Sequence, residues 1–192
     1  MAAASDPDFR ANISKTGDML VIDYRIENTQ VQPVFVTNKL WRLVETKPQI
    51  DPDFVYGRIT ENGLLMLSKT MPEIPSGQSP ANLVAPYTTR LDPGQSLSET
   101  VNLPIPVQTY LEYTNNSTAK DDKGQPVVET VSEIMFSVGY FLLPPGSSMR
   151  KEKAFGTEVD LFQNPPGARA TYGILSSAKF RLSIPVYKKA AG

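Results

Sequence analysis

The chain has 192 residues, of which 40% are hydrophobic and 20% charged, and these values are typical of a globular protein. Nineteen basic and twenty acidic residues leave a net charge of −1, so no general positive field attracts phosphate backbones, and we expect no nucleic-acid partner. The absence of cysteine and histidine excludes disulfides, thiolate zinc sites and imidazole proton shuttles, and with them most familiar hydrolase and metalloenzyme mechanisms. We therefore expect no cofactor and no metal, and assign no catalytic residue.

Alternation of apolar and polar residues predicts strands along most of the chain. In 19–26, Leu20, Ile22, Tyr24 and Ile26 occupy every second position, which is typical of a strand with one buried face. The glycine-containing connection 15–18 predicts a hairpin between this strand and an earlier one at 9–14. Further strands are predicted at 34–41, 53–59, 64–69, 87–91, 96–103, 130–142 and 174–186.

Proline and glycine divide these strands. The run Asp92-Pro93-Gly94-Gln95 has the composition of a tight turn, and Pro104 and Pro106 end the strand that starts at Ser96. Three connections are long: 71–86, 108–126 and 143–169. About eight short strands separated by turns predict an all-β fold, an antiparallel β-sandwich with long inter-strand loops. No shift in composition divides the chain, so we expect a single domain over 1–192.

Three segments resemble bacterial immunoglobulin-like β-sandwich domains in style. They are 24–28 followed by 33–36, then 91–96, and finally 138–141. Trp41 falls where such domains often place a tryptophan, although both core cysteines of antibody domains are missing. The resemblance implies an immunoglobulin-like fold and no particular activity, because such sandwiches serve adhesion, scaffolding, chaperoning and binding.

Two of the predicted strands are apolar on both faces. In 130–142, Met135 and Phe141 lie opposite the apolar face of Ile134 to Leu142, and in 34–41, Phe35 and Trp41 lie opposite Val34, Val36 and Leu40. These side chains predict an outer patch that requires a cover. The loop 143–169 contains Phe155 and Phe162, which would serve either as a lid or as part of an interface with another protein chain or a second copy. The candidate binding residues are therefore Phe35, Trp41, Met135, Phe141, Phe155 and Phe162.

The sequence favours a non-enzymatic binding or protein–protein interaction domain. One alternative is a hydrolase-type enzyme that uses carboxylates or serine and lysine in a loop cleft, and another is a structural subunit of a larger assembly. Ser-x-x-Lys occurs at Ser117/Lys120, Ser148/Lys151 and Ser176/Lys179, but catalysis would require each pair on one helical turn, and these positions lie in predicted loops or strands.

The first residues, Met1 to Pro7, lack the basic and apolar regions of a signal peptide. We therefore expect a cytoplasmic protein, or a periplasmic or secreted one whose signal peptide has been removed. No run approaches the roughly 18 apolar residues of a membrane span, so none is expected.

Overall fold

A computed structural model of the chain describes residues 6–80 and 84–190, and Met1 to Ser5 of the N-terminal segment lie outside the described residues. The described part is all-β and contains no helix, as the sequence predicted. Its strands are β1 (Asp8–Thr16), β2 (Met19–Glu27), β3 (Val34–Lys39), β4 (Trp41–Val44), β5 (Lys47–Ile50), β6 (Tyr56–Ile59), β7 (Leu64–Lys69), β8 (Tyr87–Leu91), β9 (Ser96–Pro104), β10 (Val128–Leu142), β11 (Ser148–Ala154), β12 (Thr157–Gln163), β13 (Thr171–Ser176) and β14 (Phe180–Tyr187).

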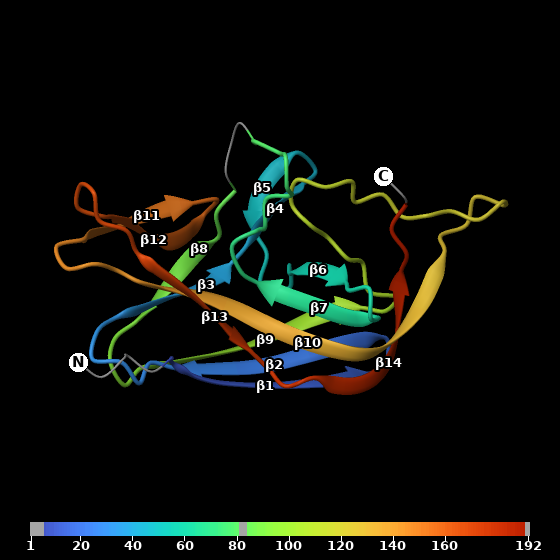
Figure 1. The fold of residues 1–192 in the computed structure, drawn as a ribbon, viewed down its shortest axis with the longest axis horizontal. Helices are drawn as coiled ribbons and strands as arrows, with labels where there is room; N and C mark the ends of the chain where they lie inside the picture. Colours follow the sequence, from blue (N-terminus) through green and yellow to red (C-terminus); the bar gives the residue numbers. More distant parts are fainter. Residues whose placement is uncertain (1–5, 81–83, 191–192) are drawn as a thin grey trace.

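A three-stranded antiparallel sheet, ordered β1-β2-β9, forms one layer (Figure 1). The predicted hairpin is confirmed: Gly17, with φ 58°, lies in the turn between β1 and β2, a conformation that glycine adopts at little cost. The predicted turn at Asp92 to Gln95 leads into β9, and Asn28 closes this end of the sheet by donating from its side chain to the carbonyl oxygen of Leu91 at 2.8 Å.

The larger sheet is built around β10. Its strand order is β11-β12-β8-β3-β10-β7-β6. Two further strands, β13 and β14, also pair with β10 but are not part of this linear order. Because β3 and β13 both pair with residues 140–142, they lie on opposite edges of β10. In the same way β7 lies opposite β14, since both pair with residues 133–134. The long strand β10 therefore joins four neighbours (Figure 1).

One pair departs from the expected antiparallel arrangement. β7 pairs in parallel with β10, with Leu65 opposite Ile134 and Leu67 opposite Phe136. A parallel pair requires a long connection, and the 58 residues from Thr70 to Val127 supply one. The expectation of a purely antiparallel fold is therefore wrong for this pair, because local alternation does not reveal strand direction.

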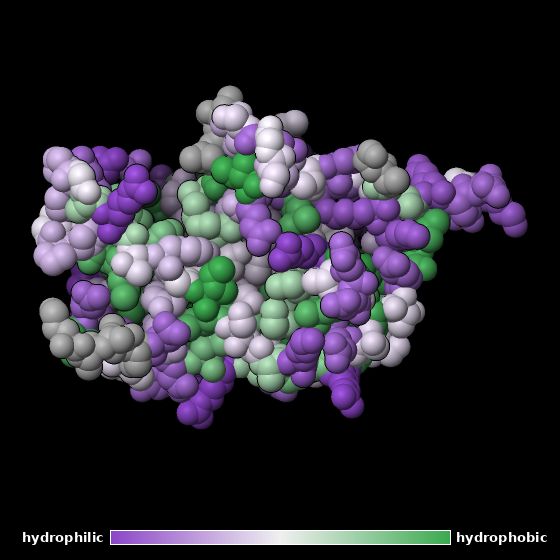
Figure 2. All heavy atoms as spheres, in the orientation of Figure 1, coloured by the Kyte–Doolittle hydropathy of each residue, from purple (hydrophilic) through white to green (hydrophobic). Residues whose placement is uncertain are grey.

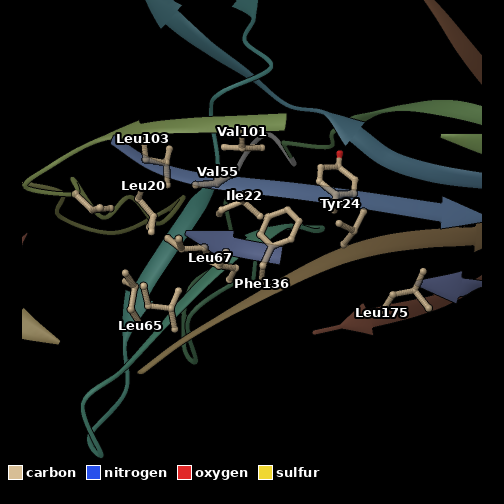
Figure 3. Close-up of a cluster of buried hydrophobic side chains, with 14 of the residues drawn as sticks. Leu20, Ile22, Tyr24, Val55, Leu65, Leu67, Val101, Leu103, Phe136 and Leu175 are labelled. Atoms are coloured by element: carbon tan, nitrogen blue, oxygen red, sulfur yellow. The ribbon is translucent and has the colours of Figure 1, made fainter. Parts of the chain in front are cut away.

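The two sheets share one hydrophobic core. Leu20, Ile22 and Tyr24 of β2 face Leu67 and Phe136 of the larger sheet (Figure 3). The side chains of Ile22 and Phe136 are fully buried, and the ring centroids of Tyr24 and Phe136 are 5.1 Å apart. The apolar face predicted for 130–142 is thus the face that fills the core.

Several predicted segments have different boundaries. The strand expected at 174–186 is two strands, β13 and β14, separated by residues 177–179. The strand expected at 34–41 ends at Lys39, and Trp41 begins β4. The connection 143–169 contains the hairpin of β11 and β12, whereas 108–126 has no strand and its tip projects from the body as a hydrophilic arm (Figures 1 and 2).

The structure has no helix among the described residues with the length and apolar character needed to cross a membrane.

Candidate binding groove

A groove lies between the β4–β5 hairpin, the end of β9 and the segment that follows β9. Its volume is about 800 Å³, which lies within the range of small-ligand sites. The residues that define the groove and carry its chemistry are Trp41, Arg42, Leu43, Asp51, Asp53, Phe54, Asn102, Tyr110, Glu112 and Tyr187. Figure 2 shows hydrophobic and hydrophilic residues side by side over the β4–β5 region.

The β4–β5 hairpin forms one wall. Glu45 and Thr46 connect the two strands with φ values of 48° and 71°, as in the two-residue turns that match strand twist. At the open end, Arg42 pairs with Asp51 at 2.7 Å between the guanidinium and a carboxylate oxygen. This hairpin leaves Leu43 66% exposed, so the wall presents an apolar side chain to solvent.

Two aromatic rings, those of Phe54 and Tyr110, line the floor, and Tyr56 packs against both from outside the lining. The ring centroids of Phe54 and Tyr110 are 5.2 Å apart, and those of Phe54 and Tyr56 are 5.6 Å apart. The backbone N–H of Gly57 donates to the carbonyl oxygen of Tyr110 at 2.7 Å, which holds the segment after β9 against β6. Because Phe54, Tyr56 and the neighbouring Leu40 are buried together, this floor is a small core of its own.

The charged side chains of the groove are unevenly neutralised. Asp51 has Arg42 as its partner, whereas Asp53 accepts a hydrogen bond from the backbone N–H of Asn102 at 2.8 Å. Burial raises the pKa of Glu112, and a hydrogen bond from the Tyr110 hydroxyl partly offsets that rise. Two of the three carboxylates, those of Asp53 and Glu112, are therefore held by neutral donors.

The six residues of the predicted patch fall into separate places. Phe162 of β12 packs on Phe35 and Phe141, with ring centroids 6.1 and 5.6 Å apart. Phe155, in the β11–β12 turn, packs on Trp41 at 5.5 Å. Met135 lies six residues before Phe141 on β10, beside Met66 of β7. The β11–β12 hairpin thus contacts the outer face from within the same chain, and a role of these residues in binding another chain stays a prediction.

The Trp41–Phe155 contact has a measurable consequence. We expect Trp41→Glu to lower the free energy of unfolding by about 2 kcal/mol, less than the 3–5 kcal/mol of a fully buried aromatic, because Trp41 is half-buried. Urea denaturation measures this loss, and analytical ultracentrifugation of both proteins measures association. Unchanged stability together with a dimer that dissociates in the variant would contradict the lid and identify an interface.

The Ser176/Lys179 pair has other partners, as does Asp121 in the connection 108–126. Ser176 hydrogen-bonds Ser137 at 2.9 Å, and Lys179 pairs with Glu133 at 3.6 Å. Asp121 accepts from the backbone N–H groups of Lys123 and Gln125, which shapes the exposed tip of the 108–126 arm. Within residues 6–80 and 84–190, no three His, Cys, Asp or Glu side chains are grouped as a metal site would require.

Of the groove residues, the sequence analysis named only Trp41 as a candidate binding residue, as a member of the outer patch, and it missed the floor. Tyr110 and Glu112 belong to the connection 108–126, in which the stretch 115–124 is polar. The run Tyr110-Leu111-Glu112-Tyr113 was the available signal, because two aromatic residues and a leucine in a polar loop indicate a segment that packs against something.

Comparisons of the chain with protein-family models, with curated proteins and with solved structures found no significant match. The function must therefore be argued from the groove itself.

Proposed function

We propose that this chain is an immunoglobulin-like β-sandwich that acts as a non-enzymatic binding domain, and that the groove beside β4 and β5 is where it contacts its ligand. Two sheets that share one core, with the elaborated connections on the periphery, support the sandwich assignment. The observation that carries the function is the groove itself: an aromatic floor beneath exposed apolar and charged side chains.

The rim of the groove has the character of a contact surface. Leu43, which lines the groove, is 66% exposed, and Phe155, which packs on the groove residue Trp41, is 40% exposed. Exposed apolar side chains gathered around a cavity gain free energy when a ligand covers them. A ligand in the groove would remove this surface from water and contact Trp41.

The chain contains a built-in reporter for this test, because Trp41 is its only tryptophan and lines the groove. We expect ligands found by screening libraries of short synthetic peptides and soluble oligosaccharides to change the fluorescence of Trp41 and to protect it from iodide quenching. The substitution Leu43→Ser should weaken binding by at least tenfold at nearly unchanged stability, because Leu43 is mostly exposed and serine removes its apolar surface without adding charge.

Val31→Ser is the matched control, since Val31 is 98% exposed in the connection between β2 and β3 and does not line the groove. It should bind as the unmodified chain does. If no library member protects Trp41, or if both variants lose affinity equally, the groove is not the binding site.

A further inference from the structure

The charges of the groove indicate the kind of ligand. Its lining contains one cationic side chain, Arg42, and three carboxylates, those of Asp51, Asp53 and Glu112. Arg42 is engaged by Asp51 at 2.7 Å. In the part of the chain that the structure describes, neither Asp53 nor Glu112 has a lysine or arginine within ion-pair distance. The lining of the groove therefore has an excess of negative charge, although the buried Lys69 ammonium, which is paired with Glu99, also acts on Asp51 and Asp53.

The groove already binds one cation from its own chain. The guanidinium of Arg42 lies 5.8 Å from the centroid of the Phe54 ring while it pairs with Asp51. This combination of an aromatic face and a carboxylate is a favourable environment for a positive group. Tyr110 and Glu112 also combine an aromatic ring with a carboxylate, elsewhere in the groove. Among the described residues, no lysine or arginine forms an ion pair with Glu112.

Burial makes the Tyr110–Glu112 pair more selective for a cationic ligand. Because desolvation raises the pKa of Glu112, its carboxylate is costly to keep charged in the free protein. A ligand cation next to it would offset that cost, whereas a ligand phosphate or carboxylate would be repelled.

The remaining lining is apolar. Trp41 and Leu43 form one wall, and Pro104, Ile105 and Pro106 line the other. Proline has no backbone N–H, so the 104–106 wall offers an incoming chain few donors and mainly apolar surface. A ligand that matches the whole groove must carry apolar groups on either side of a positive charge, and an extended peptide supplies that alternation.

We infer that the groove binds an extended peptide segment that carries a lysine or arginine, with the cationic side chain beside Glu112, Asp53 and Tyr110 and with apolar neighbours against Trp41 and Leu43. This inference rests on the proposed function of the groove and adds the chemical class of its ligand.

The test uses eight-residue synthetic peptides in which apolar residues flank lysine or arginine, with matched peptides that carry glutamate or glutamine at the basic position. Trp41 fluorescence and isothermal titration calorimetry measure binding to the full chain. We expect the basic peptides to bind, their affinity to fall as salt is raised, and Glu112→Gln to reduce it about tenfold. Asp122→Asn, in the exposed tip of the 108–126 arm, is the matched control and should have no effect.

The pH profile gives a further readout. As pH falls through the raised pKa of Glu112, its carboxylate gains a proton and its attraction for a cation is lost, so affinity should decrease toward acidic pH. Glu112→Gln should remove that part of the pH dependence.

Each result bears on the two proposals separately. Equal binding of the glutamate, glutamine and basic peptides would overturn the charge inference and leave the groove as a binding site. Protection of Trp41 by neutral oligosaccharides alone would also overturn the peptide inference and retain the proposed function. Failure of every probe would overturn both.

Discussion

Replacing Gly139 with alanine is expected to lower the free energy of unfolding by about 3 kcal/mol, at the upper end of the range for an overpacked core. Gly139 lies in the middle of β10, and an added Cβ would lie 2.6 Å from the Thr37 hydroxyl oxygen and closer still to that of Tyr172. Neither atom is free to move, because the Thr37 hydroxyl lies within hydrogen-bond distance of the carbonyl oxygens of Lys69 and Gly139, and Tyr172 accepts from the backbone N–H of Met71.

Gly173 shows the same arrangement on the neighbouring strand. It lies directly opposite Tyr140 in the β10–β13 pair, and an added Cβ would lie 2.6 Å from the Tyr140 hydroxyl oxygen. The two glycines thus allow Tyr172 and Tyr140 to lie across the sheet, as aromatic side chains do when they cover glycine in a neighbouring strand.

Urea denaturation measures the effect of Gly139→Ala, and Gly17→Ala is the control. Gly17 has φ 58° and no atom within 4 Å of an added Cβ, so its substitution should cost only about 1 kcal/mol of backbone strain. Equal losses for the two variants would contradict a role of steric exclusion at Gly139.

Replacing Lys69 with alanine is expected to cost about 3–5 kcal/mol, the range for breaking a buried ion pair by removing one partner. The Lys69 side chain is 1% exposed, lies 3.4 Å from the Glu99 carboxylate and donates to the carbonyl oxygen of Pro52 at 2.7 Å. Glu99 also accepts hydrogen bonds from the Tyr24 hydroxyl and from the Asn38 side chain, the latter at 2.6 Å. Without Lys69, a partly buried carboxylate and a carbonyl oxygen lose their charged partner.

This cluster connects the two layers of the fold. Tyr24 and Glu99 belong to the three-stranded sheet, whereas Lys69 and Asn38 belong to the larger one. The Lys69 ammonium also lies 5.8 Å from the centroid of the Tyr24 ring. A polar cluster of this kind fixes how the sheets are placed relative to each other, since its hydrogen bonds form in only one arrangement.

A double variant separates charge from packing. We expect Lys69→Met combined with Glu99→Gln to recover a large part of the stability lost in Lys69→Ala, because methionine fills the space and no unpaired charge remains. Chemical denaturation at neutral pH measures all three proteins. If the double variant is as unstable as Lys69→Ala, the ion pair is not the origin of the loss.

The pH dependence has a defined sign. Burial lowers the pKa of Lys69, an effect that Glu99 only partly offsets, so above that lowered value and below 10.5 the unfolded chain binds the proton more strongly than the folded one. The contribution of Lys69 to stability therefore increases with pH in that window. Comparison with Lys69→Met, which has no titrating amine, isolates this contribution.

The sequence alone determined that the chain is all-β and where most of its strands lie. The alternation of Leu20, Ile22, Tyr24 and Ile26 placed β2 and its buried face, and 64–69 and 87–91 coincide with β7 and β8. These predictions were right because residues two apart on a strand face the same side. A strand that packs on the core therefore has apolar residues at every second position of its sequence.

The β4–β5 and β11–β12 hairpins were not resolved by the same reasoning. Trp41–Val44 and Lys47–Ile50 are only four residues each, and β11 contains the charged run 150–153, so β4, β5 and β11 have no long apolar face. Their position depends on contacts with distant residues, such as that of Phe155 with Trp41.

Only the tertiary structure decided the parallel pairing of β7 with β10 and the residues that meet in the groove. Trp41, Asp53, Asn102 and Glu112 come from four separate stretches of the chain, and no spacing between them indicates that they converge. Alternation of apolar and polar residues indicates which side of a strand is buried. It does not indicate the direction of the strand or its neighbours, because these depend on the path of the long connections around the core. The sequence therefore specified the faces of the sheets, and the packing of the two sheets and their connections created the groove.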